Sequence, residues 1–340
     1  MSKTVLFSAL LVFPAIAAAQ PGMAELLELN RSLVQVSVDL GNGRSGTGTG
    51  VVLSPQEVIT NCHVLANANG VNVAKYGDAH RPIAMKADWK HDLCLLRFEG
   101  LPFPPVKLRD SAGLQYQQDV FAISYPNDTN VPQPSYGSIK AIYPYDGSVI
   151  VRSSAAFSLG SSGGAMFDQA SNLIGITTFK SPGKNAYFYS MPVEWIRRLR
   201  EVPDTLSLKT DEIPFWALPE AERPDFMRVV IPYQNREWDA LEKLAAQWLA
   251  REPANADALH FLALAEQGLG KTAQAVAHLK QAVNINPRHL DAQVTLAMLA
   301  IAAGDRPGAE RIRDEVRTLD EEAADNLSRN IEAMRPNASG

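Results

Sequence analysis

The sequence is poor in cysteine, in long apolar runs and in clustered positive charge, and each shortage excludes a class of protein. It holds two cysteines, Cys62 and Cys94, whereas a structural zinc site needs four cysteines or a histidine and cysteine cluster. Past the first residues no apolar run is long enough to span a bilayer. The net charge is −5 and no stretch gathers lysine and arginine, so nucleic-acid binding lacks an electrostatic basis. We therefore expect no metal, no other cofactor, no membrane span and no nucleic-acid partner.

The amino-terminal residues have the pattern of a secretory signal peptide. Lys3 precedes an apolar run over residues 5–16, and three alanines follow at 17–19. This order predicts a signal peptide over residues 1–19, with cleavage before Gln20. Cleavage removes Lys3 and so changes the net charge from −5 to −6. We expect an exported protein, periplasmic or secreted, in which the two cysteines form one disulfide bond.

The rest of the chain changes pattern once, from strands to helices. At roughly 150 residues per domain, its length suggests about two domains. Between Leu33 and Pro192, short β-branched runs alternate with turn residues and no helical period appears. This pattern predicts an all-β barrel or sandwich. From residue 227 onward the chain is rich in Ala, Leu, Glu and Gln, which is typical of helices.

A glycine-rich stretch, Gly46-Thr47-Gly48-Thr49-Gly50, runs into the apolar residues 51–53. A dinucleotide-binding fingerprint would place a helix after such glycines and an acidic residue about 20 positions later. Another β run, Val58-Ile59-Thr60, follows instead. We therefore interpret the stretch as part of a strand and not as a cofactor loop.

A second small-residue stretch, Gly160-Ser161-Ser162-Gly163-Gly164, lies between apolar runs. A serine hydroxyl is a poor nucleophile unless a base accepts its proton and donors stabilise the oxyanion that forms. Alone, the stretch fits an ordinary turn. It also fits the nucleophile elbow of α/β-hydrolases, but that elbow is followed by a helix, whereas residues 172–179 have a strand pattern.

Two upstream stretches decide between these interpretations. Thr60-Asn61-Cys62-His63-Val64 closes one β run, and Asp92-Leu93-Cys94-Leu95-Leu96 opens another. Together with the serine stretch, in the order His63, Asp92, Ser162, they resemble the chymotrypsin-like (trypsin-like) serine proteases. The resemblance implies a double β-barrel with a protease domain over residues 24–200.

The resemblance also implies a role for each matched residue. Ser162 is the expected nucleophile, His63 the general base and then acid, and Asp92 the residue that orients the imidazole. The backbone N–H groups of Gly160 and Ser162 are the expected oxyanion hole. Asp92 must touch His63, so Cys62 and Cys94 beside them should lie within bridging distance.

Two departures from the digestive members concern activation and specificity. Ser161 stands where those enzymes have an aspartate that pairs with a freed amino terminus, so the chain looks more like the bacterial HtrA-type branch; we expect only the backbone of Ser161 to matter. The expected primary pocket has Ala156 at its base. Because no acidic residue stands there, a preference for Arg or Lys in the substrate is not expected, and we expect the pocket to accept a modest apolar side chain. The expected pocket wall consists of Thr177, Thr178, Phe179 and Lys180. His80 and His91 are expected on the surface.

The carboxy-terminal region resembles tetratricopeptide repeats. Four prolines interrupt residues 201–226, which predicts a linker packed along the barrel. Pro253 and Pro287 then lie one 34-residue period apart, and residues 227–335 are expected to form about two and a half helical repeats in a small solenoid. Three histidines of this region, His260, His278 and His289, are expected on or beside helices with no serine or acid arrangement around them.

The sequence thus predicts a multidomain β + α protein: a chymotrypsin-like double barrel followed by a helical repeat solenoid. The expected function is an exported serine endopeptidase acting on protein or peptide substrates. Its repeats are expected to recruit a substrate or a protein partner, or to serve only as a structural or dimerising appendage, and to contribute nothing to the chemistry. Two alternatives remain: a catalytically inactive binding protein on the same folds, and a serine esterase. The complete triad argues against the inactive form.

Overall fold

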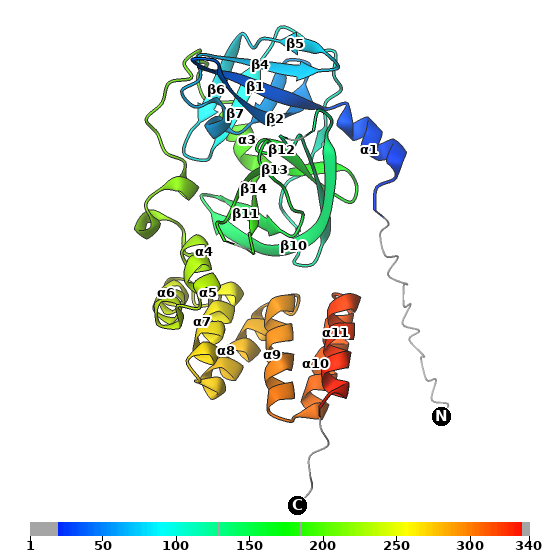
Figure 1. Ribbon diagram of the computed structural model, residues 1–340, viewed down its shortest axis with the longest axis vertical. Helices are drawn as coiled ribbons and strands as arrows, with labels where there is room; N and C mark the ends of the chain where they lie inside the picture. The colour runs from blue at the N-terminus through cyan, green and yellow to red at the C-terminus, as the bar shows by residue number, and fades with distance from the viewer. Residues whose placement is uncertain (1–19, 128, 184, 335–340) are drawn as a thin grey trace, which may run out of the picture.

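The computed structural model describes residues 20–127, 129–183 and 185–334. The expected signal peptide, residues 1–19, lies outside the described residues. Two β-sheets form one end of the molecule and a stack of helices forms the other, as Figure 1 shows. The short helix α1 (Met23–Asn30) precedes the sheets. In the part of the chain described here, every helix falls short of the length and apolar character that a bilayer crossing requires.

The first sheet has seven strands in the order β5-β4-β1-β2-β3-β7-β6, paired antiparallel. Its strands are β1 (Leu33–Gly41), β2 (Arg44–Ser54), β3 (Glu57–Thr60), β4 (Gly70–Lys75), β5 (Asp78–His80), β6 (Ala84–Asp88) and β7 (Leu93–Arg97). The helical turn α2 (Cys62–Leu65) follows β3. Gly41, Asn42 and Gly43 join β1 to β2 with positive φ angles, as hairpin turns of this composition do.

The second sheet has the order β12-β9-β10-β11-β14-β13-β8, and an additional β12–β13 pairing closes it on itself. Its strands are β8 (Lys107–Leu108), β9 (Asp119–Ser124), β10 (Gln133–Tyr145), β11 (Ser148–Ser153), β12 (Gly164–Asp168), β13 (Asn172–Lys180) and β14 (Phe188–Pro192). Helix α3 (Val193–Leu199) ends this part of the chain. The expected double β-barrel architecture is confirmed.

The segment between the barrels and the helices runs along the first sheet and back to the second. Thr205 pairs with Met85 of β6 through two backbone hydrogen bonds of 2.8 and 2.9 Å. Further on, the N–H of Asn67 donates to the carbonyl of Leu208 at 2.8 Å, and the N–H of Phe215 donates to the carbonyl of Lys90 at 3.0 Å. The segment packs along the barrel, as the sequence predicts.

Helices fill the rest of the chain. After the short turns Phe215–Ala217 and Glu220–Glu222 come α4 (Asp225–Arg228), α5 (Val230–Asn235), α6 (Trp238–Arg251), α7 (Ala256–Gly268), α8 (Thr272–Ile285), α9 (Leu290–Ala302), α10 (Arg306–Arg317) and α11 (Glu321–Glu332). Neighbouring helices pack as antiparallel pairs, and the buried side of the stack is rich in Ala and Leu. The predicted helical repeat region is therefore present.

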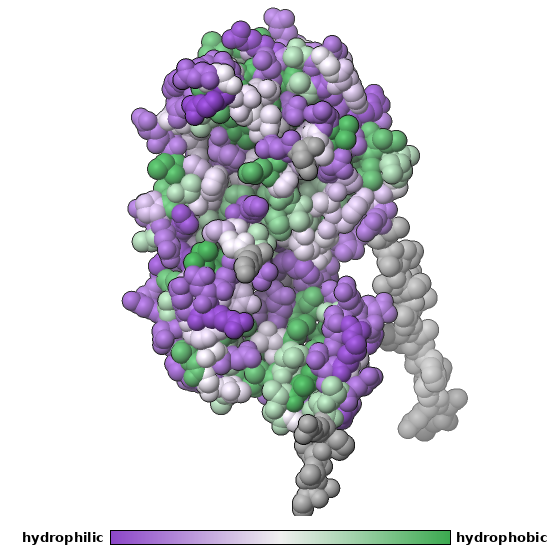
Figure 2. All heavy atoms as spheres, in the orientation of Figure 1, coloured by the Kyte–Doolittle hydropathy of each residue, from purple (hydrophilic) through white to green (hydrophobic). Residues whose placement is uncertain are grey.

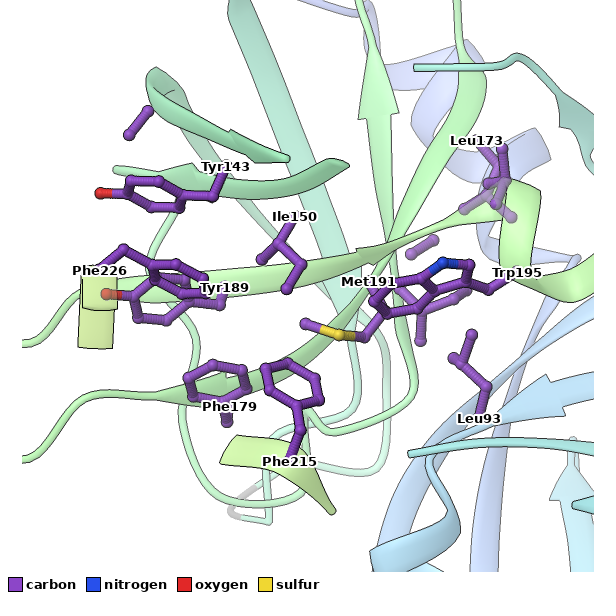
Figure 3. Packing of buried hydrophobic residues seen from close by; sticks show 14 of the residues in the cluster. Leu93, Tyr143, Ile150, Leu173, Phe179, Tyr189, Met191, Trp195, Phe215 and Phe226 are labelled. Carbon is purple, nitrogen blue, oxygen red and sulfur yellow. The ribbon is translucent and has the colours of Figure 1, made fainter. Parts of the chain in front are cut away.

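The apolar core of the second barrel continues into the first helices. The ring of Tyr143 (β10) stacks on Phe226 (α4) at 4.2 Å, and Phe226 also lies beside Tyr189 (β14), as Figure 3 shows. Trp248 (α6) reaches the same Tyr143 at 6.2 Å. Burial of such aromatic surface is worth a few kcal/mol per side chain. The barrel and the first helices therefore share one core.

Polar groups extend this contact to α7 and α9. Asp257 at the start of α7 accepts a hydrogen bond from the hydroxyl of Tyr116, and Arg288 donates to the carbonyl of Tyr116 at 2.6 Å. Arg152 of β11 lies 3.5 Å from the carboxylate of Asp291 in α9. The first helices of the two repeats thus face the second barrel.

Two of the three histidines of the repeats, His278 and His289, have acidic partners, contrary to expectation. His289 lies 3.6 Å from Asp257 and is 1% exposed, while Nδ1 of His278 contacts Glu266 at 2.8 Å. His260 is also buried, with its ring 4.9 Å from that of His289. Helical periodicity cannot reveal this arrangement, because both acids lie on α7 whereas His278 lies on α8 and His289 at the start of α9.

Candidate active site

His63 and Asp92 meet between the first sheet and the segment that follows the barrels. His63 lies in α2, directly after β3, and Asp92 lies in the turn before β7, with φ +61°. Nδ1 of His63 is 2.6 Å from Oδ2 of Asp92, and the backbone N–H of His63 donates to Oδ1 at 2.7 Å. An ionised carboxylate only accepts hydrogen bonds, so Nδ1 carries the proton and Nε2 is left as the acceptor.

A third donor to this carboxylate comes from Trp216. Its indole Nε1–H donates to Oδ2 of Asp92 at 3.0 Å. Its ring meets that of His63 edge-on, with centroids 5.4 Å apart, and stacks on Phe179 at 5.3 Å. Asp92 is fully buried, while 30% of the His63 side chain is exposed. The three donors therefore fix the acid, and the imidazole remains open to a reactant.

Sequence reasoning missed Trp216 because it lies 124 positions after Asp92, outside every recognised motif. One signal was present: Phe215 and Trp216 are apolar residues in a proline-rich linker, a composition that favours packing on the barrel. The segment packs on the barrel as expected, but nothing in the sequence indicated that it would reach Asp92.

The serine loop is anchored by β2 of the other barrel. The N–H of Thr49 donates to the carbonyl of Ser162 at 2.8 Å, and its hydroxyl donates to the carbonyl of Gly160 at 3.0 Å. A Cβ on Gly48 would lie 2.7 Å from Val64 and 3.2 Å from the carbonyl oxygen of Ser162. The glycine-rich strand therefore lets the two barrels approach closely at the site.

Ser162 and the expected oxyanion donors lie at the tip of this loop. Gly160 has φ +88°, a conformation that glycine adopts without strain. The hydroxyl of Ser162 donates to the carbonyl of Thr178 at 3.3 Å. Among the residues described, no protein acceptor takes the N–H of Gly160 or Ser162.

Cys62 and Cys94 form a disulfide bond, with Cα atoms 4.9 Å apart. Thr60 of β3 pairs with Cys94 of β7, so the bond ties together the two segments that carry His63 and Asp92. On the chain-entropy account, closing a loop with a sequence separation of 32 contributes about 3–4 kcal/mol to stability.

The residues of the expected primary pocket separate into three groups. Ala156 is exposed. The hydroxyls of Thr177 and Thr178 donate to backbone carbonyls at 2.9 Å. Phe179 and Lys180 line a cavity of about 320 Å³, whose other lining residues come from the same barrel (Ser181, Pro182 and Tyr189) and from the chain after the barrels, between residues 216 and 231. The structure therefore brings only Phe179 and Lys180 of this set to one cavity.

Two further expectations are wrong. His91 is not a surface residue: it is 6% exposed, and its two ring nitrogens contact Asp88 at 2.7 Å and Asp146 at 2.8 Å. Ser161 contributes its side chain as well as its backbone, because its buried hydroxyl contacts that of Ser124 at 2.8 Å. Both residues face inward because the loops that carry them fold over the barrel ends.

Comparison with known families matches two parts of the chain. The family described as "Trypsin-like peptidase domain" matches residues 48–176, which include all three matched motifs. The family described as "Tetratricopeptide repeat" matches residues 264–328.

Known relatives match the barrel part. A "probable periplasmic serine endoprotease DegP-like" of Ectopseudomonas mendocina is 28% identical over 197 residues, covering 52% of this chain and 41% of the relative. Serine protease Rv3671c of Mycobacterium tuberculosis is 28% identical over 117 residues, covering 34% of this chain and 27% of the relative. The chain thus spans well under half the length of these relatives.

A solved structure supports the same fold. The active form of the Rv3671c protease has a TM-score of 0.50 at 19% identity, covering 61% of this chain and 99% of that one. At this identity the likeness concerns the fold. The chain therefore carries a trypsin-like peptidase domain, related in sequence to DegP-like serine endoproteases, followed by tetratricopeptide repeats.

Proposed function

We propose that the protein is an exported serine endopeptidase that cleaves peptide bonds through an acyl-enzyme on Ser162. His63, Asp92 and Ser162 form its catalytic triad, and the N–H groups of Gly160 and Ser162 form its oxyanion hole. Because Ala156 is exposed, the proposal includes no deep, charge-selective primary pocket. Export rests on the amino-terminal sequence and on the periplasmic description of relatives.

The single observation that carries the proposal is the His63–Asp92 pair beside the serine loop. Asp92 holds Nδ1–H of His63 at 2.6 Å, so Nε2 is free to accept a proton from a hydroxyl. The hydroxyl of Ser162 donates to the carbonyl of Thr178 in this structure, and the proposed mechanism requires it to turn from there toward Nε2 into another staggered rotamer.

The chemistry then follows in two steps. Oγ of Ser162 attacks the carbonyl carbon of the substrate while Nε2 of His63 takes the hydroxyl proton, and the oxyanion forms between the two N–H groups. His63 gives this proton to the leaving amine as the C–N bond breaks. A water molecule, deprotonated by the same Nε2, hydrolyses the acyl-enzyme, and the proton returns to Ser162.

Labelling with a fluorophosphonate tests this proposal in the mature full-length protein. We expect covalent labelling at Ser162, located by mass spectrometry of the digested protein, and release of peptides from casein. A folded protein that remains unlabelled would support the inactive binding protein instead. Labelling with turnover of small esters but none of casein would support the esterase.

We further propose that any partner of the repeats binds on the side away from the barrel. The first helices, α7 and α9, face Tyr116 and Arg152 of the second barrel. On another side, α8, α9 and α10 line a cavity of about 500 Å³, and Figure 2 shows apolar residues over α9 between its neighbours. Cross-linking of bound protein to α8 or α10, but not to α7, would support this arrangement.

A further inference from the structure

The cavity beside the proposed triad is built by two distant parts of the chain. Phe179 and Lys180, at the end of β13, form one wall. Trp216, Met227 and Ile231, from the segment after the barrels, form the opposite side. The cavity of about 320 Å³ has the size of a large side chain with room for part of its neighbour.

Trp216 and Phe179 connect this cavity to the reacting groups. One edge of the Trp216 indole donates to Asp92, and its ring meets His63 at 5.4 Å. Phe179 directly follows Thr178, whose carbonyl accepts the hydroxyl of Ser162. The two walls of the cavity are therefore continuous with the base and with the nucleophile. At ~3.3 Å per residue, four residues of an extended peptide held at Ser162 span about 13 Å, the range in which we look for the cavity's occupant.

The lining has a definite chemical character. Apolar side chains dominate it, including Phe179, Met227 and Val230. Its charged members are Lys180 and Arg223, and none of the described lining residues is acidic. Lys180 is exposed, so its ammonium group is free to meet a carboxylate at the entrance.

We infer that this cavity is a substrate subsite that takes an apolar side chain of the cleaved polypeptide, with a carboxylate beside it at Lys180 and Arg223. This inference rests on the proposed function. The substrate class it names is extended polypeptide segments that carry a large apolar residue next to Asp or Glu, within about four residues of the scissile bond. Residues beyond the barrels are then part of substrate recognition.

Cleavage-site profiling of the mature full-length protein on denatured proteins tests this subsite. Mass spectrometry of the products should place a large apolar residue at one fixed position within about four residues of the cut, with an acidic neighbour. Two synthetic peptides that differ only in that neighbour, Glu or Lys, then give a ratio of kcat/KM values. We expect the Glu peptide to be favoured at least tenfold.

Two variants address the two halves of the inference. Lys180→Glu changes an exposed residue and should lower the Glu-to-Lys ratio at least tenfold, while the control Lys107→Glu, on exposed β8, keeps the wild-type ratio. Ala217→Phe places a ring at the exposed mouth of the cavity and should lower the preference for Leu over Ala at the apolar position about tenfold. Circular dichroism establishes that each variant is folded.

The outcomes separate this inference from the proposed function. If wild-type protein neither labels with a fluorophosphonate nor cleaves casein, the proposed function fails. If it cleaves but shows no fixed apolar position, or if Lys180→Glu keeps the ratio of its control, the subsite is overturned. If Ala217→Phe instead lowers the mass of the protein in solution and leaves the profile unchanged, a second copy of the chain occupies the cavity, which also overturns the inference.

Discussion

Two of the Asp–His pairs in the described residues, His63–Asp92 and His289–Asp257, differ in their surroundings, and the difference indicates what makes such a pair a reactive site. In the barrels, His63 lies 2.6 Å from Asp92, and 30% of its side chain is exposed beside the serine loop. At the barrel–repeat interface, His289 lies 3.6 Å from Asp257, and its side chain is 1% exposed. The first pair leaves one ring nitrogen for a reactant, whereas the second is closed in by protein.

The hydrogen-bond partners of the two carboxylates also distinguish the two pairs. Asp92 accepts two hydrogen bonds from His63 and one from Trp216, so its orientation is fixed. Asp257 is shared between Tyr116 of the barrel and His289 of the repeats. Burial alone would raise the pKa of Asp257, but the contacts with His289, Arg152 and Tyr116 lower it to about 2. We interpret the first pair as catalytic and the second as a joint between domains.

The largest expected effect comes from removing the proposed nucleophile. Ser162→Ala should lower kcat about 10⁶-fold, on the order of 8 kcal/mol, because no other hydroxyl can form the acyl-enzyme. Casein hydrolysis measures it. Ser45→Ala, an exposed change in the β1–β2 hairpin, is the control and should keep wild-type activity. Ser161→Ala is unsuitable as a control, since its hydroxyl is buried and hydrogen-bonded. Equal losses of kcat in Ser162→Ala and Ser45→Ala would show that Ser162 is not the nucleophile.

A matched pair of substitutions sharpens the comparison directly. Asp92→Asn should lower kcat about 10⁴-fold, because the amide stabilises the wrong imidazole tautomer. Asp257→Asn should leave kcat per folded molecule unchanged and lower the free energy of unfolding by about 3–5 kcal/mol, since it leaves a buried partner unpaired. Active-site titration and urea unfolding measure the two quantities. If Asp257→Asn lowers kcat as strongly as Asp92→Asn does, the assignment of different roles to the two pairs is contradicted.

Acid should destabilise the barrel–repeat interface in a defined pH range, because the buried His260 lies beside His289 there. Burial, helped by the nearby charges of His289 and Arg152 and opposed by those of Asp291 and Asp257, lowers the pKa of His260 to about 3. Its usual value is 6.5, so below pH 6.5 the unfolded chain binds a proton that the folded chain does not. Stability is therefore complete above pH 6.5 and falls by about 1.4 kcal/mol per pH unit down to about pH 3.

Urea unfolding at pH 7 and pH 5 measures this loss, which amounts to about 2 kcal/mol over the 1.5 units below 6.5. His260→Gln removes the titrating group and should flatten the dependence, whereas His80→Gln, in the first sheet, should keep the wild-type slope. An unchanged slope in His260→Gln would place the pH sensitivity elsewhere.

The parts of the molecule that could be predicted from sequence are those with local signals. Alternating β-branched runs predicted the strands. The short motifs around His63, Asp92 and Ser162 predicted, through their resemblance to the serine proteases, that His63 and Asp92 pair and that Ser162 lies in a turn. The 34-residue period likewise predicted the helical pairs.

The parts that escaped prediction depend on packing between distant segments. Trp216 reaches Asp92 only because residues 205–215 run back along the barrel. His91 looked like a surface residue because nothing near it in sequence announces Asp146, 55 positions later. Likewise, periodicity assigned His289 to a helix start but could not indicate that the barrel covers it.

The smallest expected effect tests the central claim that the barrels and the segment after them form one catalytic unit. Trp216→Phe keeps a smaller aromatic ring at the place that stacks on Phe179 and removes the N–H that donates to Asp92. A hydrogen bond to a charged group is worth about 1.5–3 kcal/mol, so the second-order rate constant for fluorophosphonate labelling of Ser162 should fall at least tenfold with little change in the melting temperature. An unchanged rate constant in the folded variant would contradict the account and confine the catalytic unit to the barrels.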